Sequence, residues 1–395
     1  MNASLSSHRL SSIDMARGII MIIMALDHVR EYLHTDAFLF SPVDLTKTTT
    51  ALFFTRWITH YCMPTFVFLA GTAIYLSAQR KSKSELAKYL LWRGLMLIVI
   101  EFTLMRFIFY FNFYYDLTIL SVFWLFGWCM ILMAGLLYLS EAALLSIGLA
   151  ILLLHDLSAL VPVDTTSVWF APWTILFRAG FLPATPTVAF VSSYPIIPWL
   201  GVMLLGYSLG RWYRPSVAPE NRKRWLIQAG VISILLFVVL RWINVYGDPA
   251  PWSTQPTSWY TVLSFLNATK YPVSLLFILM TVGPLLLLLA YLENIQSSAL
   301  TAIQTIGRVP FFYFVMHFLL IHVAAVVINM INTGKSLSEI DFHASASLGG
   351  ATAEGGISLA GVYFAWVILL IVMYPLCRWY NRVRSSGKYA WVTSL

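Results

Sequence analysis

The side chains best suited to chemistry lie in one stretch near the start of the chain, RLSSIDMARGIIMIIMALDHVREYLH over residues 9–34. An uninterrupted apolar run, 18–26, follows Arg17 and precedes a cluster of ionisable residues. The cluster consists of Asp27, His28, Arg30, Glu31 and His34. Histidine changes its charge near neutral pH, so a histidine with acidic neighbours is suited to general-base catalysis or to proton transfer.

A single helix through this stretch would point Arg17 and His28 in the same direction, about 16 Å apart along the helix axis. Glu31 lies on that face as well, one turn after His28, whereas Asp27 points about 100° away. A membrane-spanning helix has about 20 residues, so Asp27 and His28 would lie near mid-depth, where ionisable groups by default indicate a functional site. The alternative is a structural Asp27–Arg30 ion pair, with Arg17 reaching the membrane interface.

The composition identifies the class of protein. Of the 395 residues, 59% are hydrophobic and only 11% are charged, and the mean hydropathy is +0.77, whereas soluble domains have about 25% charged residues. The net charge of +8 does not indicate a nucleic-acid partner, because the basic residues lie at the ends of apolar runs. The three cysteines lack metal-ligand spacing and a disulfide framework, and no metal site is expected. The first residues lack a signal-peptide pattern, so we expect the first apolar run to remain as a span.

We therefore predict an all-α integral membrane protein, a bundle of about ten transmembrane helices that forms one multi-pass domain over residues 1–395. The predicted spans are 16–34, 57–78, 87–107, 117–139, 142–161, 192–212, 225–246, 272–292, 309–331 and 358–379. Basic residues cluster in 80–93, 211–224 and 378–388. Because cytoplasmic loops are enriched in lysine and arginine, this distribution places both termini in the cytoplasm.

Two further spans carry ionisable residues. Arg56 and His60 lie four residues apart on one helix face near the outer end of the second span, and Pro64 follows where it would break the helix. Glu101 lies deep in the third span, five residues before Arg106, a spacing that turns the two side chains apart. We expect Glu101 to form a structural ion pair with a partner on another helix.

The remaining candidates lie in the second half of the chain. His317 is a second histidine near mid-depth, in the ninth span, and Lys270 lies at the outer end of the eighth span. The outer loops contain Trp252 and Trp259, whose rings could stack on a sugar. The alternative for each tryptophan is the aromatic belt that flanks membranes.

Several segments together resemble a bacterial member of the heparan-alpha-glucosaminide N-acetyltransferase-like family, within the wider transmembrane acyltransferase superfamily. Besides the opening stretch, they are THYCMPTFVFLAGTAIYL, YPIIPWLGVMLLGYSLG, KYPVSLLFILMTVGP, GRVPFFYFVMHFLLIH and YPLCRWYNRVRSSGKYAWVTSL. The spacing of Arg17 and His28, with ten residues between them, is also similar to a pattern of the acyltransferase-3 proteins. The resemblance implies transfer of an acetyl group from cytoplasmic acetyl-CoA to an amine or hydroxyl of a sugar on the outer side of the bacterial inner membrane.

This resemblance leaves the identity of the base open. In lysosomal members of the family, asparagine stands at the place that matches His28, and the catalytic histidine lies in the loop beyond the first span. In this chain, His34 is the nearest loop histidine. The base is therefore His28 or His34, and either Asp27 or Glu31 would orient His28.

The other roles under this hypothesis fall into two groups. The phosphates of acetyl-CoA would bind Arg17, Arg93 and Arg308. The acceptor, a carbohydrate or another small molecule, would bind Arg56, His60, His317, Trp252, Trp259 and Lys270. Membrane lipid would surround the bundle, and the sequence leaves the oligomeric state open, a homodimer included.

Two other functions are compatible with the same residues. A proton-coupled transporter or flippase could use His28, Glu101 and His317 as a proton relay. No pair of internal repeats, which many transporters have, is visible in the sequence. The third hypothesis is a structural membrane partner without catalytic turnover.

Overall fold

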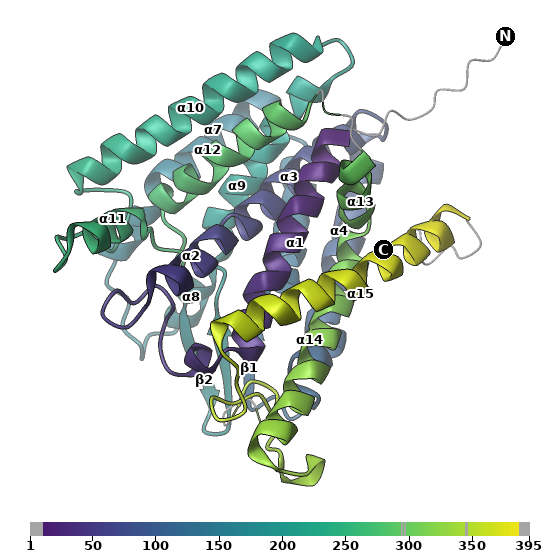
Figure 1. The fold of residues 1–395 in the computed structure, drawn as a ribbon. Helices are drawn as coiled ribbons and strands as arrows, with labels where there is room; N and C mark the ends of the chain where they lie inside the picture. The colour runs from purple at the N-terminus through teal and green to yellow at the C-terminus, as the bar shows by residue number, and fades with distance from the viewer. Residues whose placement is uncertain (1–10, 294, 296–297, 344–346, 387–395) are drawn as a thin grey trace.

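The computed structural model describes residues 11–293, 295, 298–343 and 347–386, and this part of the chain is mostly helical (Figure 1). The helices are α1 (Ser11–Leu33), α2 (Thr50–Thr59), α3 (Cys62–Ala78), α4 (Lys83–Ile100), α5 (Arg106–Tyr110), α6 (Val122–Leu136), α7 (Glu141–Leu154), α8 (Phe170–Phe177), α9 (Ile196–Leu209), α10 (Pro219–Ile243), α11 (Ser258–Leu266), α12 (Leu275–Leu292), α13 (Ser298–Gly307), α14 (Pro310–Thr333) and α15 (Leu359–Ser385). The strands are β1 (Leu117–Leu120), β2 (Gly180–Thr185) and β3 (Val188–Ser192).

Within the described residues, six helical segments are long and apolar enough to cross a membrane. They are Thr50–Ala78, Glu141–Leu160, Pro219–Ile243, Leu275–Leu292, Pro310–Thr333 and Leu359–Ser385. The other predicted spans correspond to α1, α4, α6 and α9. Helices α6 and α9 have only 15 and 14 residues, and α1 contains several charged residues. The helices therefore fit a multi-pass membrane protein, while the count of ten spans and the cytoplasmic termini stay predictions.

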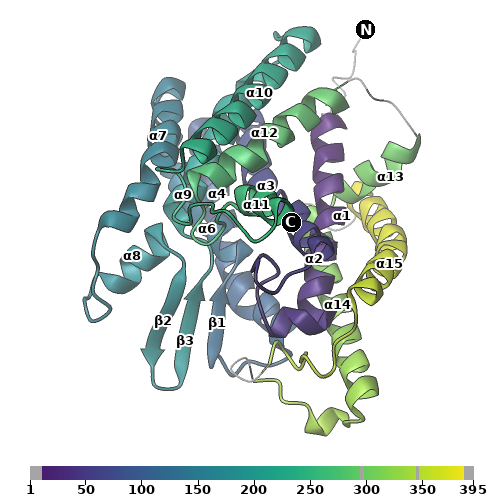
Figure 2. The same cartoon turned by 60° about the vertical axis from the view of Figure 1, so that its left-hand side comes forward.

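The chain is not entirely helical, so the all-α prediction is wrong in this respect. Three strands form one sheet in the order β1–β3–β2, with β1 parallel and β2 antiparallel to β3. Figure 2 shows them side by side at one end of the molecule. Strand β1 occupies the start of the predicted span 117–139, and β2 and β3 form a hairpin. A four-residue apolar run such as LTIL has too little periodicity to distinguish a strand from a helix, which explains the error.

Helix α1 lies among the other helices and contacts α2, α3, α12, α13, α14 and α15 (Figure 1). Glycines allow α13 to approach α1 closely. A Cβ atom at Gly18 would lie 2.1 Å from the carbonyl oxygen of Ile303, and one at Gly307 would lie 1.9 Å from that of Asp14. The other end of α1 is held by the segment before α15, because Ile357 donates its N–H to Leu33 and accepts that of Thr35.

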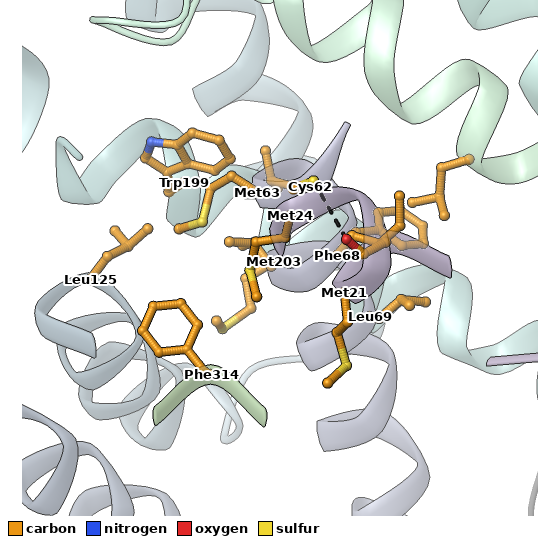
Figure 3. Close-up of a cluster of buried hydrophobic side chains, with 14 of the residues drawn as sticks. Met21, Met24, Cys62, Met63, Phe68, Leu69, Leu125, Trp199, Met203 and Phe314 are labelled. Carbon is orange, nitrogen blue, oxygen red and sulfur yellow. Dashed lines mark hydrogen bonds between the residues drawn. The ribbon is translucent and has the colours of Figure 1, made fainter. Parts of the chain in front are cut away.

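Methionine-rich packing joins α1 to its neighbours (Figure 3). Met21 and Met24 of α1, Met63 of α3 and Met203 of α9 are all buried in one apolar cluster. The thiol of Cys62 donates to the carbonyl oxygen of Ile20 at 3.6 Å, the contact dashed in Figure 3. Flexible methionine side chains fill irregular gaps between helices, and here they form the apolar surroundings of the middle of α1.

The break predicted near Pro64 is present. Helix α2 ends at Thr59 and α3 begins at Cys62, so Pro64 occupies the first turn of α3, where no backbone N–H is needed. Pro195 similarly precedes the first residue of α9, and the start of that helix is regular.

The predicted ion pair of Glu101 is wrong. The Glu101 carboxylate accepts three backbone N–H groups at the start of α6, from Ser121, Phe123 and Trp124 at 3.0, 3.1 and 3.2 Å. The partner does lie on another element, as expected, but it is a helix N-terminus, where unpaired N–H groups and the helix dipole attract a carboxylate. Arg106 pairs with Asp116 at 3.1 Å instead.

Candidate functional site

A cavity of about 810 Å³ runs between α1, α3, α4, α6 and α14. Seven of the predicted site residues line it: Arg17, Asp27, His28, Glu31, Arg93, Lys270 and Arg308. Arg17 and His28 lie three turns apart on one face of α1, and Met24, between them in the sequence, also lines the cavity. The sequence spacing of Arg17 and His28 therefore corresponds to two positions in one cavity.

Two histidines from different helices meet at the cavity wall. The Nδ1 atom of His28 lies 2.8 Å from the Nε2 atom of His317, and the Nδ1 atom of His317 lies 2.8 Å from the carbonyl oxygen of Tyr313. The His28 ring stacks on Phe318 with the ring centroids 4.0 Å apart. His28 is half-buried and lines the cavity, whereas His317 is fully buried behind it. The pair thus has one half-buried member that lines the cavity and one fully buried member.

Asp27 lies in an ion network beside the histidine pair. Its carboxylate accepts a hydrogen bond from Arg30 at 3.0 Å and another from Arg56 of α2. This is the Asp27–Arg30 pair that the sequence left open as the structural alternative, with Arg56 added. Among the described residues, the hydrogen-bonding partner of His28 is His317 and not an acidic residue.

Glu31 belongs to the same network but is less tightly held. Its carboxylate lies 3.5 Å from Arg30 and 3.6 Å from Arg56, and 37% of its side chain is exposed. It lines the cavity, so its carboxyl group is available to a polar ligand there.

The opposite end of the cavity is basic. Arg17, Arg93 and Arg308 line it together with Tyr89 and Arg384 of α15, two residues that the sequence analysis did not select. The Arg384 side chain donates to the backbone carbonyl oxygen of Arg308 at 3.0 Å, which holds Arg384 at the start of α14. In the sequence, Arg384 belongs to the basic cluster 378–388, from which we predict only the orientation of the chain in the membrane. Grouped guanidinium groups are suited to bind phosphates.

Beyond the histidines, the cavity is lined by a lysine and two tyrosines. The hydroxyl groups of Tyr194 and Tyr271 lie 3.2 Å apart, and the Lys270 ammonium lies 5.0 Å from the centre of the Tyr271 ring. Burial alone would raise the pKa of the Tyr271 phenol, but the positive charges of Lys270 and Arg56 outweigh it, and the pKa is lowered. Neither tyrosine is among the site residues predicted from the sequence, although each directly precedes a proline that lies shortly before a helix, α9 or α12.

The remaining predicted site residues lie outside the cavity lining. His34 is buried just after α1, with its Nε2 atom 4.0 Å from Asp36, and His60 is buried with its ring 5.2 Å from that of Phe277. The Trp252 indole donates to the carbonyl oxygen of Arg241, and the Trp259 indole donates to Thr50. These contacts hold Trp252 in the loop after α10 and Trp259 in α11, and the role of both in binding an acceptor stays a prediction. Within the described ranges, no group of three or more His, Cys, Asp or Glu side chains could hold a metal ion.

The fold indicates a mostly helical multi-pass membrane protein that contains a cavity lined by charged residues and a histidine. Residues 9–246 match the family of the heparan-alpha-glucosaminide N-acetyltransferase catalytic domain. This match covers more than half of the chain, so the chain belongs to that family, and the resemblance inferred from the sequence is confirmed. It is therefore a membrane acetyltransferase by family, and enzymes of this kind use acetyl-CoA as donor. A comparison with curated proteins finds no match.

Proposed function

We propose that this protein transfers the acetyl group of acetyl-CoA to an amine or hydroxyl of a sugar, with His28 as the general base. The donor binds at the basic end of the cavity, and the acceptor approaches from the end with Lys270 and Glu31. Following the distribution of basic residues, the donor end faces the cytoplasm of a bacterial cell and the acceptor end faces outward across the inner membrane.

The observation that carries the proposal is that one cavity is lined both by Arg17, Arg93 and Arg308 and by His28. Coenzyme A carries its phosphates at one end and its thioester at the other, which requires a site with separate anion-binding and reactive parts. The separation of Arg17 and His28 by about 16 Å along α1 provides this arrangement. The cavity volume of about 810 Å³ lies in the range of sites for small molecules and cofactors.

In the proposed reaction, the acceptor nitrogen or oxygen attacks the carbonyl carbon of the thioester while His28 removes its proton. The new bond forms to the acetyl carbon, the carbon–sulfur bond breaks, and the departing thiolate of coenzyme A takes up a proton. Direct transfer needs a single base within reach of both substrates. Because both substrates would share one cavity, we favour direct transfer over an acetyl-histidine intermediate.

The choice of His28 over His34 follows from their surroundings. His28 lines the cavity, whereas His34 is buried beyond the end of α1 and is not part of the lining. A general base must come within hydrogen-bonding reach of the proton that it removes, and this favours His28.

The test is acetyl transfer in proteoliposomes from labelled acetyl-CoA to glucosamine and related glycans. We expect His28→Ala to abolish transfer and His34→Ala to retain most of it. Loss of activity only in His34→Ala would reject His28 as the base. Absence of coenzyme A binding together with absence of transfer to any glycan would reject the proposed function, and a flux driven by a pH gradient that needs His28 would support the transporter hypothesis instead.

A further inference from the structure

The contacts of His317 determine which of its nitrogens carries the proton. Its Nδ1 atom lies 2.8 Å from the carbonyl oxygen of Tyr313, one helical turn earlier in α14. A carbonyl oxygen only accepts hydrogen bonds, so Nδ1 of His317 is the protonated nitrogen. In a neutral imidazole the other nitrogen, Nε2, then has a free lone pair and acts as an acceptor.

The same reasoning extends to His28. Its Nδ1 atom lies 2.8 Å from Nε2 of His317, which is an acceptor, so His28 must donate from Nδ1. The proton on Nδ1 leaves Nε2 of His28 without a proton. A neutral His28 in this arrangement therefore has its lone pair on Nε2.

The surroundings favour a neutral His317. Its ring is fully buried and contacts the rings of Tyr313, Phe314 and Phe318. In the part of the chain that the structure describes, no acidic side chain forms an ion pair with it, and a buried charge without such a partner is costly. His28, His317 and the Tyr313 carbonyl group form a chain of two hydrogen bonds. Its last acceptor is fixed in position, because it is a backbone carbonyl oxygen and not part of a side chain that could rotate.

We propose that His317 is a positioning residue, which holds His28 in the tautomer whose Nε2 atom serves as the base. This inference rests on the proposed acetyltransferase function and deepens it. During transfer, the proton of the acceptor moves to Nε2 of His28, and the resulting imidazolium keeps its Nδ1–H bond to His317. The proton then leaves from Nε2 to the thiolate of coenzyme A, which restores the starting tautomer. Asp27 has no part in this chain, because its carboxylate is occupied by Arg30 and Arg56.

The first test separates loss of the acceptor from loss of the ring. His317→Leu removes the acceptor for His28, whereas the side-chain amide of His317→Gln retains an acceptor oxygen. We expect the kcat of acetyl transfer to fall by roughly 10²- to 10⁴-fold in His317→Leu, the usual contribution of general acid–base catalysis. The KM for acetyl-CoA should not change, and His317→Gln should keep more activity than His317→Leu. An equal loss in both variants, or a change in KM alone, would overturn the proposal.

His322→Leu provides the matched control. This histidine also lies on α14 and is buried, but its ring nitrogens bond to the backbone carbonyl groups of Ile108 and Gly349. It tests the effect of losing a buried histidine from the same helix without touching His28. A loss of kcat in His322→Leu as large as in His317→Leu, in protein that remains folded, would show a structural role and overturn the proposal.

The second test does not need a stable variant. The ¹⁵N spectrum of wild-type protein labelled on histidine reports directly which ring nitrogen is protonated, and comparison with His28→Ala assigns the signals of His28. We expect a protonated Nδ1 and an unprotonated Nε2. A protonated Nε2 in neutral His28 would overturn the proposal, whatever the variants show. The expected tautomer in a protein that transfers no acetyl group would reject the proposed function while supporting the tautomer.

Discussion

The ion network around Asp27 allows a quantitative prediction. The side chains of Asp27, Arg30 and Arg56 are only 8%, 4% and 10% exposed. Removing one partner from a buried ion pair costs about 3–5 kcal/mol, because a charge remains buried without compensation. Asp27→Asn leaves two buried guanidinium groups with only the longer contacts to the partly exposed Glu31, at 3.5 and 3.6 Å, so we expect a loss of about 3–5 kcal/mol in the free energy of unfolding.

Glu31 provides the comparison within the same network. It is 37% exposed and lies 3.5 and 3.6 Å from the two arginines. Ion pairs that water can reach contribute about 0–1 kcal/mol, so Glu31→Gln should lower the free energy of unfolding by no more than about 1 kcal/mol. The substitution is of the same kind in both variants, which isolates the effect of burial.

The assay is reversible unfolding in mixed micelles by titration with sodium dodecyl sulfate, followed by tryptophan fluorescence. A double-mutant cycle completes it, with Asp27→Asn combined with Arg56→Met. Because Arg56→Met removes one of the uncompensated charges, the double variant should lose less stability than the sum of the two single losses. Equal destabilisation by Asp27→Asn and Glu31→Gln, or strictly additive losses in the cycle, would refute the reasoning.

Three further predictions follow from single contacts. Arg308→Gln should raise the KM for acetyl-CoA about tenfold or more with kcat retained, because a hydrogen bond to a charged group contributes about 1.5–3 kcal/mol. An unchanged KM in steady-state kinetics would contradict this. Gly206→Ala should destabilise the protein by about 1–3 kcal/mol, because the added Cβ would lie 1.9 Å from the Phe68 carbonyl oxygen, whereas Gly135→Ala meets no atom within 4 Å. Thermal unfolding should therefore separate these two variants, and equal midpoints would speak against the contact. Glu101→Ala should lower the unfolding temperature more than Glu101→Gln, which keeps an acceptor for the start of α6; the reverse order would be inconsistent with the capping role.

The parts of the site that could be predicted from sequence depend on local geometry. The separation of Arg17 and His28 is fixed by the helical repeat, so their common face required no knowledge of the fold. Likewise, the pairing of Asp27 with Arg30 follows from their spacing of three residues, and the sequence predicts it as the structural alternative to a catalytic role of Asp27.

The contact between His28 and His317 could not be derived in this way. It depends on the rotation of α14 against α1, which is set by packing across 289 residues of sequence separation. The sequence could indicate only that both histidines lie near mid-depth. Arg384, Tyr194 and Tyr271 were missed for the same reason, because their positions at the cavity arise from contacts between distant elements.

The strands and the role of Glu101 were missed for a different reason. Strand β1 is short and apolar, and its pairing partner β3 lies far along the chain. The prediction for Glu101 is an ion pair with a partner on another helix, since a buried carboxylate needs compensation. Backbone N–H groups at the start of a helix provide that compensation equally well, and they cannot be recognised from residue types.

The position of the first helix in the chain has a consequence for biosynthesis. The charge of Asp27 is compensated by Arg30 of the same helix and by Arg56, which follows Asp27 by only 29 residues in the growing chain. His28 obtains its partner only when α14 has been made, because His317 lies 289 residues later. The ion network can thus form as soon as α2 has been made, whereas the histidine pair must wait for α14. While the elements from α3 to α13 are being made, a nascent chain can therefore contain the ion network without the histidine pair.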